Sequence, residues 1–453
     1  MFDAAAFARA ARLERTIVSL PASSSIPAAA PQAAPRLRLD YLDGLRGLAA
    51  LYVVLHHAYY GLTQEEALPS TVAHLTYWLF LGRSAVDIFI VLSGYCLMMP
   101  VVRAGTGFLP GGIVDFVRRR ARRILPPYFG ALLLSLLAIA FVPALHSAPL
   151  QSLWATALPV WSPGVLLSHV LLIHNFSPGW HSKIDYPMWS VATEWQIYFL
   201  FPLLLLPVRR RAGMWAMLLT AFVVGVVPLA LFFERFSGVA PHFLGLFALG
   251  MAGAEINFSA NVALLRLRDK LPWGWLAGAL VVMLGLVSVK HSDWYLFLAV
   301  KDIIVGAMTA CLLLFCTRHL TRAHDVQNGR ADSHFSARPA PPILRVFESR
   351  AAVSLGAFSY SLYLVHAPIL AVCQSVLRPL HLSPTIALAL MLGIAVPLAV
   401  AGSFLFHLAF ERPFLTRRAV ADKATGRVRW YAPWRNAQET PPLEPVSGKP
   451  RAS

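Results

Sequence analysis

Charged residues are scarce in this sequence, and their scarcity excludes an ordinary soluble domain. Asp, Glu, Lys and Arg make up 13% of the 453 residues, whereas about 25% is usual for soluble globular proteins. Hydrophobic residues reach 57%. A chain with so little charge and so many apolar residues is typical of a protein embedded in lipid.

Cysteine is also rare, and its placement excludes two kinds of site. The four cysteines all fall within apolar stretches, at Cys96, Cys311, Cys316 and Cys373. They are too dispersed for a metal-binding knuckle, and they do not form the pattern of an extracellular disulfide framework. We therefore expect buried thiols, no bound metal and no resident cofactor.

Acidic residues are outnumbered, with 22 Asp and Glu against 39 Lys and Arg, so the formal net charge is +17. Such an excess could indicate nucleic-acid binding. Here, however, the basic residues form short clusters between apolar runs, as expected for charges that fix the topology of a membrane protein. We expect contacts with membrane lipids and no nucleic-acid partner.

Apolar runs recur along the chain, and their lengths suit helices that cross a bilayer. They predict an all-α, polytopic membrane protein with about ten transmembrane helices. The predicted spans lie near residues 45–61, 78–99, 124–143, 190–207, 214–233, 241–257, 273–289, 296–317, 352–377 and 384–410.

The loops between these spans differ in charge. Those around residues 118–123, 209–211 and 266–270 are basic, whereas the loops on the opposite side hold few Lys or Arg. Basic loops stay in the cytoplasm, and an even number of spans returns the chain to the side on which it started. Both termini are therefore expected in the cytoplasm.

Three segments outside the spans lack a long apolar run. Residues 1–38 are rich in Ala, Pro and Ser and are expected to form a disordered cytoplasmic arm. The transmembrane domain then covers residues 39–415 and includes a cytoplasmic loop at 318–350. Residues 416–453 are expected to form a disordered cytoplasmic tail.

Arg46 and His57 lie eleven residues apart within one apolar run. At about 100° and 1.5 Å per residue, they share a helix face and are separated by roughly 16 Å along the axis. Charged and titratable residues are costly inside a membrane helix, so they usually mark a functional site. This spacing predicts proton or anion chemistry within the membrane domain.

Five short motifs occur along the chain in a fixed order. They are Leu42-Asp-Gly-Leu-Arg-Gly-Leu-Ala-Ala followed by His57, Val86-Asp-Ile-Phe-Ile-Val-Leu-Ser-Gly-Tyr, Arg118-Arg-Arg-Ala-Arg-Arg-Ile-Leu-Pro-Pro-Tyr, Trp189-Ser-Val-Ala-Thr-Glu-Trp-Gln-Ile-Tyr and Phe358-Ser-Tyr-Ser-Leu-Tyr-Leu-Val-His. Together they resemble the motifs of the acyltransferase-3 family, the O-antigen-acetylase-like integral membrane acyltransferases. The resemblance implies ten membrane helices. It also implies transfer of an acyl group, usually acetyl, from cytoplasmic acyl-coenzyme A to a glycan or another hydroxylated acceptor.

His57 and Glu194 are the candidate catalytic residues. His57 matches the family's histidine by its spacing from Arg46, and an imidazole suits the removal of a proton from a hydroxyl. Glu194 is expected at a similar depth, where a carboxylate could orient or charge-stabilise that imidazole. The alternatives are a packed core histidine and an acidic residue favoured by the dipole at a helix N-terminus.

Arg46, Arg120 and Arg123 are the candidate donor-binding residues. Arg120 and Arg123 share a helix face and match the Arg-x-x-Arg of the family's third helix, and two guanidiniums suit the phosphates of coenzyme A. Arg46, near the cytoplasmic end of its helix, could bind a phosphate or the acyl carbonyl. Alternatively, the cluster is only a topology signal and Arg46 snorkels to lipid headgroups.

Five further polar residues within the spans are candidate supporting residues: Asp87, Ser93, Tyr198, Tyr363 and His366. Asp87 is costly in a membrane helix unless it is paired, and Arg83, one turn earlier, is its candidate partner. Tyr363 and His366 lie at helical spacing in the ninth span. His366 fits a packing residue or a backbone hydrogen-bonding partner as well as it fits a ligand of coenzyme A.

Taken together, these patterns predict an O-acyltransferase of the bacterial inner membrane. Its co-substrate would be acyl-coenzyme A, with acetyl as the first candidate, and its acceptor a hydroxyl of a cell-surface, exported or lipid-linked glycan. Two alternatives stay open. A transporter of glycans or lipids would also carry intramembrane charges, although no internal repeat of the kind that many transporters contain is evident. A family member could instead use another donor, such as succinyl-coenzyme A.

Overall fold

Helices form almost all of the structure, a computed structural model that describes residues 37–146, 152–158, 160–289, 295–327, 340–415, 418–421 and 428–431. Side chains are described for these residues except 289, 295, 296, 327 and the last two segments. Most of the predicted arm at 1–38, part of the predicted loop at 318–350 and most of the predicted tail at 416–453 lie outside the described residues.

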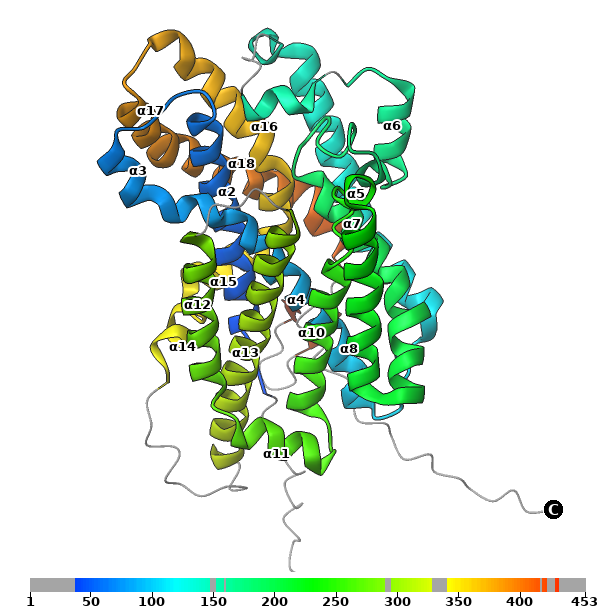
Figure 1. Cartoon of the computed structure of the whole chain (residues 1–453). Helices are drawn as coiled ribbons and strands as arrows, with labels where there is room; N and C mark the ends of the chain where they lie inside the picture. Colours follow the sequence, from blue (N-terminus) through cyan, green and yellow to red (C-terminus); the bar gives the residue numbers. More distant parts are fainter. Residues whose placement is uncertain are drawn as a thin grey trace, which may run out of the picture. The chain divides into compact units, whose positions relative to one another are not determined.

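Figure 1 shows how the helices are arranged. The longer ones are α2 (Tyr41–Thr63), α4 (Ser84–Ala104), α5 (Gly112–Phe141), α7 (Met188–Leu200), α8 (Leu206–Leu231), α10 (Phe243–Phe258), α12 (Trp273–Val289), α13 (Tyr295–Gln327), α16 (Ser359–Leu377) and α18 (Val396–Phe406).

Shorter elements connect or extend these helices. The short α-helices are α3 (Ser70–Thr76), α6 (Pro163–Val170), α9 (Phe233–Phe236), α11 (Val262–Lys270), α14 (Pro342–Phe347), α15 (Arg350–Ala357) and α17 (Pro384–Leu390). The other helical turns are η1 (Tyr77–Arg83), η2 (Pro143–Leu145), η3 (Leu153–Ala157), η4 (His174–Phe176), η5 (Phe201–Leu205), η7 (Arg378–Leu380), η8 (Met391–Ala395), η9 (His407–Glu411) and η10 (Arg412–Phe414).

The expected all-α, polytopic membrane fold is confirmed, but the expected count of ten spans is not. Among the described residues, six helical stretches are long and apolar enough to cross a membrane, or seven if α10 and α11, bent by 100°, form one span. One stretch, Met188–Leu231, covers two predicted spans, although Gly213 interrupts its helical geometry with φ 84° and ψ 178°. The helix α2 is not among the six, since polar residues such as Arg46 and His57 lower its hydropathy.

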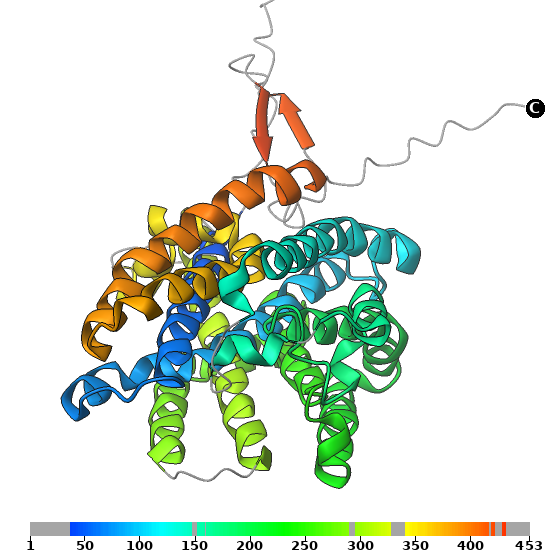
Figure 2. The same cartoon turned by 90° about the horizontal axis from the view of Figure 1, so that it is seen from above.

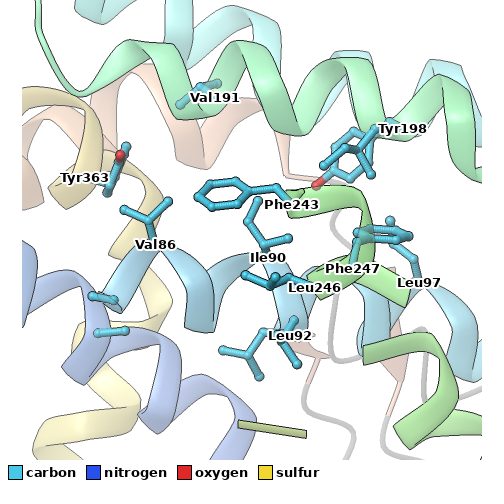
Figure 3. Packing of buried hydrophobic residues seen from close by; sticks show 14 of the residues in the cluster. Val86, Ile90, Leu92, Leu97, Val191, Tyr198, Phe243, Leu246, Phe247 and Tyr363 are labelled. Atoms are coloured by element: carbon cyan, nitrogen blue, oxygen red, sulfur yellow. The ribbon is translucent and has the colours of Figure 1, made fainter. Parts of the chain in front are cut away.

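The centre of the structure is the contact between α4 and α10. Glycines let the two backbones approach closely, as in many membrane helix pairs. A Cβ added at Gly94 would lie 2.0 Å from the carbonyl oxygen of Phe247, and one at Gly250 would lie 2.0 Å from that of Val91. Ile90 and Phe243 fill the adjoining space with buried apolar side chains (Figure 3).

Glycines also position Arg46 on α2. Gly44 and Gly47 lie on either side of it in sequence, and each faces the backbone of a neighbouring segment. A Cβ at Gly44 would lie 1.6 Å from the carbonyl oxygen of Phe347, and one at Gly47 would lie 2.4 Å from that of Ala352. The two glycines of this motif therefore allow α14 and α15 to pack directly on α2, which fixes the helix that carries Arg46.

The helix α2 also packs against α16, and the two lie side by side in Figures 1 and 2. Near the C-terminus, β1 (Arg418–Ala421) and β2 (Val428–Tyr431) pair as a two-stranded antiparallel sheet. The sequence predicted no secondary structure there. The β-branched and aromatic residues of these segments, such as Val428 and Trp430, favour extended backbone.

Candidate functional site

His57 and His366 form a hydrogen-bonded pair between α2 and α16. The Nδ1 atom of His57 lies 2.8 Å from Nε2 of His366, the ring centroids are 5.0 Å apart, and the ring planes are 14° from parallel. His366 is fully buried, and its Nδ1 lies 3.1 Å from the carbonyl oxygen of Leu362, one turn earlier. The structure thus brings His57 together with His366, one of the predicted supporting residues.

Two tyrosines surround this pair. The ring of Tyr186 meets His57 edge-on, with centroids 4.9 Å apart. Tyr363, one turn before His366, donates a hydrogen bond to the carbonyl oxygen of Pro187 at 3.1 Å and lies 2.6 Å from the hydroxyl of Ser190. The segment just before α7 therefore folds back against the histidine pair, a contact that sequence reasoning did not anticipate.

His56 has a different environment from His57, although the two are adjacent. Its Nδ1 lies 2.8 Å from the carbonyl oxygen of Leu79, which can only accept a hydrogen bond. Its ring stacks on Tyr60 with centroids 5.5 Å apart. These contacts are those of a packed core histidine, in line with the helix position of His56 about 100° away from His57.

Glu194 lies elsewhere than the sequence predicted. Tyr198 donates a hydrogen bond to Glu194 Oε1 at 2.6 Å, and Ser93 lies 3.0 Å from the Tyr198 hydroxyl. Within the described part of the chain, no hydrogen bond joins Glu194 to His57. The reason is the depth at which α7 begins. Since Tyr186 already contacts His57, the helix that starts at Met188 begins near the level of that histidine, and Glu194 lies about 9 Å further along its axis.

Arg46, Arg120 and Arg123 are brought together from α2 and α5. Arg46 forms an ion pair with Asp43 at 3.2 Å and also lies within electrostatic reach of Glu194. Arg123 lies within electrostatic reach of both Arg46 and Arg120. Repulsion between three neighbouring guanidiniums is unfavourable in a membrane domain, so their convergence points to an anion-binding function.

Two further contacts of the arginine cluster involve Tyr198 and Cys96. The Arg120 guanidinium lies 6.0 Å from the ring centroid of Tyr198, and its buried Nε has no hydrogen-bond partner among the described residues. Arg46 lies 3.6 Å from the sulfur of Cys96, one of the expected intramembrane thiols. A buried N–H that lacks a partner is uncommon in a folded protein, which favours a ligand as its partner.

Glu411 is an acidic residue near these arginines that sequence reasoning missed. It accepts hydrogen bonds from Ser361 at 2.6 Å and from His407 at 2.8 Å, and it lies within electrostatic reach of Arg123. The last predicted span ended at residue 410, so Glu411 was placed at the membrane boundary. Its burial, at 3% exposure, shows that it belongs to the interior.

Asp87 belongs to a separate buried cluster. Its carboxyl faces that of Asp302, and Asp302 in turn accepts hydrogen bonds from Arg83 at 3.4 Å and His242 at 2.8 Å. The expected partner Arg83 thus forms its ion pair with Asp302 rather than with Asp87. No group of three or more His, Cys, Asp or Glu in the described segments has the geometry to hold a metal ion.

Comparison with known proteins gives one family and two kinds of relative. A family model described as an acyltransferase domain matches residues 39–408. Acyltransferase MdmB of Streptomyces mycarofaciens is 30% identical over 185 residues, which cover 39% of this chain and 43% of that protein. O-acetyltransferase OatA of Staphylococcus aureus is 26% identical over 196 residues, which cover 43% of this chain and 29% of that protein. The alignments thus span less than half of each relative. No solved structure matches the chain.

Proposed function

The chain belongs to this acyltransferase family, and on that premise we propose that it is a membrane O-acyltransferase. Acyl-coenzyme A is the proposed donor, with acetyl as the first acyl group to test, and a hydroxyl of a cell-surface or exported glycan is the proposed acceptor. The main support for this proposal is the convergence of Arg46, Arg120 and Arg123, together with the His57–His366 pair between α2 and α16.

The distance between these two groups suits the proposed donor. Arg46 and His57 are separated by roughly 16 Å along α2. A donor whose phosphates bind the arginines must carry its reactive carbonyl on a long, narrow linker to reach His57. Coenzyme A has this construction, because a flexible pantetheine arm separates its phosphates from its thioester. Charge-assisted contacts from the arginines would then hold the phosphates.

His57 supplies the base in the proposed reaction. Its imidazole accepts the proton of the acceptor hydroxyl as the oxygen attacks the thioester carbonyl. The carbon–oxygen bond forms, the carbon–sulfur bond breaks, and the thiolate of coenzyme A leaves. The proton held by His57 then passes to that thiolate. The products are an ester and free coenzyme A, so no other reactant is required.

In this proposal Glu194 acts together with the donor-binding arginines rather than with His57. Its carboxylate, held by Tyr198, lies near Arg46 and offsets part of the positive charge of the cluster. Asp43 beside Arg46 and Glu411 near Arg123 provide further negative charge in the same region. A partial counter-charge also lowers the cost of keeping three guanidiniums together before the donor arrives.

Mass spectrometry tests this function. Surface glycans are compared between cells that contain the protein, cells that lack it and cells that produce the His57→Ala variant. The proposal predicts an acyl substituent only in the first sample, and its added mass identifies the acyl group. Identical glycan masses in all three samples, with the protein present in the membrane, would contradict acylation of surface glycans.

The proposed orientation places both termini in the cytoplasm of a bacterial inner membrane. A membrane-impermeant thiol reagent tests it in a variant without native cysteines. A cysteine introduced at Lys183 should be labelled in intact spheroplasts, whereas one introduced at Arg119 should be labelled only after lysis. The reverse pattern would invert the orientation and the side from which the donor enters.

A further inference from the structure

The hydrogen bonds of the histidine pair determine which nitrogen of each ring carries a hydrogen atom. The Nδ1 atom of His366 lies 3.1 Å from the carbonyl oxygen of Leu362. A carbonyl oxygen can only accept, so Nδ1 of His366 carries the hydrogen. In a neutral imidazole the other nitrogen, Nε2, is then an acceptor.

The same reasoning extends to His57. Its Nδ1 lies 2.8 Å from Nε2 of His366. Because that Nε2 accepts, Nδ1 of His57 must donate, and the lone pair of His57 therefore resides on Nε2. The opposite arrangement would require a doubly protonated His366. That residue is fully buried, and no carboxylate is hydrogen-bonded to it in the described segments, so an unpaired charge there would be costly.

We propose that His366 is a positioning residue that holds His57 in the tautomer with hydrogen on Nδ1 and so makes Nε2 the catalytic base. This inference rests on the proposed function. In water a free histidine favours the other tautomer, with hydrogen on Nε2, which could not accept the acceptor's proton at that atom. The role of His366 corresponds to that of the orienting carboxylate in a hydrolase triad, but here a neutral imidazole performs it.

The surrounding contacts keep the two rings in this geometry. Tyr186 packs edge-on against His57, and the hydrogen bond between the two nearly parallel histidine rings restricts rotation of each ring. When His57 gains a proton on Nε2, its Nδ1 hydrogen bond to His366 becomes charge-assisted and stronger. The pair therefore stabilises the protonated form that exists during transfer more than the neutral form that precedes it.

Nitrogen-15 NMR of the full-length protein in lipid nanodiscs tests the tautomer directly. Histidine side chains are labelled, and the His57 signals are assigned by comparison with the His57→Asn variant. Protonated and unprotonated ring nitrogens have clearly different chemical shifts. We expect Nδ1 of His57 to be protonated and Nε2 to be unprotonated in the wild-type protein. Hydrogen on Nε2 of neutral His57 would overturn the inference.

Two substitutions of His366 separate positioning from packing. His366→Ala should move the hydrogen of His57 to Nε2 and lower kcat about 100-fold or more, with the KM for acetyl-coenzyme A unchanged. His366→Gln offers an amide oxygen as acceptor and should restore the wild-type tautomer and part of kcat. His381→Gln, an exposed histidine beyond α16, is the matched control and should change neither quantity.

The outcomes distinguish this inference from the proposed function. If His366→Ala loses activity while the tautomer of His57 stays the same, His366 is a packing residue and the inference is wrong. If His57→Ala retains acyl transfer, the proposed function of His57 fails whatever its tautomer. A wild-type spectrum with hydrogen on Nε2, together with an inactive His57→Ala variant, would leave the proposed function intact and overturn only the role of His366.

Discussion

Gln374 donates a hydrogen bond to Glu65 at 3.0 Å across the same 309-residue offset that separates His57 from His366. The histidine pair joins α2 to α16, whereas Glu65 lies two residues beyond the last residue of α2. The shared offset means that the chain from His57 to Glu65 runs parallel to α16. Arg378 strengthens the outer contact with hydrogen bonds of 2.9 Å and 2.5 Å to the two oxygens of Glu65. Glu65, Gln374 and Arg378 thus form a polar clamp at the C-terminal ends of α2 and α16, eight or more residues beyond the histidine pair, and it helps to fix the register of that pair.

Breaking this clamp should destabilise the protein. Glu65→Ala leaves a partly buried Arg378 without its carboxylate, and we expect a loss of about 1–3 kcal/mol in the free energy of unfolding. Thermal unfolding in detergent measures it. Glu66→Ala, at an exposed neighbouring position, is the control and should have little effect. Equal melting temperatures for the two variants would show that the clamp adds nothing to stability.

The arginine cluster should determine the affinity for the donor. Each charge-assisted contact with a phosphate contributes about 1.5–3 kcal/mol, so Arg120→Gln with Arg123→Gln should raise the KM for acetyl-coenzyme A at least tenfold. Arg118→Gln with Arg122→Gln removes the same charge from exposed positions of the same helix. Steady-state kinetics should show little change in that control. If both double variants raise the KM equally, the affinity for the donor depends on the total positive charge of the helix and not on contacts made by Arg120 and Arg123.

Asp185 should make stability depend on pH. Burial raises the pKa of its carboxyl well above the ordinary value, and the hydrogen bond from Ser135 at 3.0 Å opposes this only in part. A group whose pKa is raised in the folded state contributes stability below its ordinary pKa, and that contribution is lost as the pH rises through the raised pKa. The melting temperature should therefore fall as the pH rises from the ordinary pKa of an aspartate carboxyl through the raised pKa of Asp185.

The Asp185→Asn variant isolates this contribution, because its side chain cannot ionise. Its melting temperature should depend less on pH than that of the wild-type protein over the same interval. Asp115→Asn, which removes a half-exposed carboxylate on α5, should retain the wild-type slope. A wild-type slope in Asp185→Asn as well would mean that other groups cause the pH dependence.

The parts of the site that lie on one helix could be predicted from the sequence. The eleven-residue spacing placed Arg46 and His57 on one helix, and α2 contains both. The spacing of Arg120 and Arg123 likewise identified two arginines of one cluster. Helical periodicity is a local property, so residues that share a helix can be related without knowledge of the fold.

The contacts between helices could not be predicted in this way. His366 was a candidate supporting residue, but its pairing with His57 depends on how α16 packs against α2. Glu194 was expected beside His57 by counting from the predicted ends of two spans, whereas the structure shows it hydrogen-bonded to Tyr198. The residue that contacts His57 from this part of the chain is Tyr186, just before α7, and such a contact between distant segments cannot be obtained by counting residues.

Acyl transfer by the His57→Ala variant is the most direct test of the proposed mechanism. The assay measures transfer from acetyl-coenzyme A to a glycan acceptor in membranes with equal amounts of wild-type, His57→Ala and His56→Ala protein. General-base assistance contributes about 100- to 10,000-fold, so His57→Ala should lose activity by that factor and His56→Ala by much less. Near wild-type transfer by a well-inserted His57→Ala protein would contradict the mechanism.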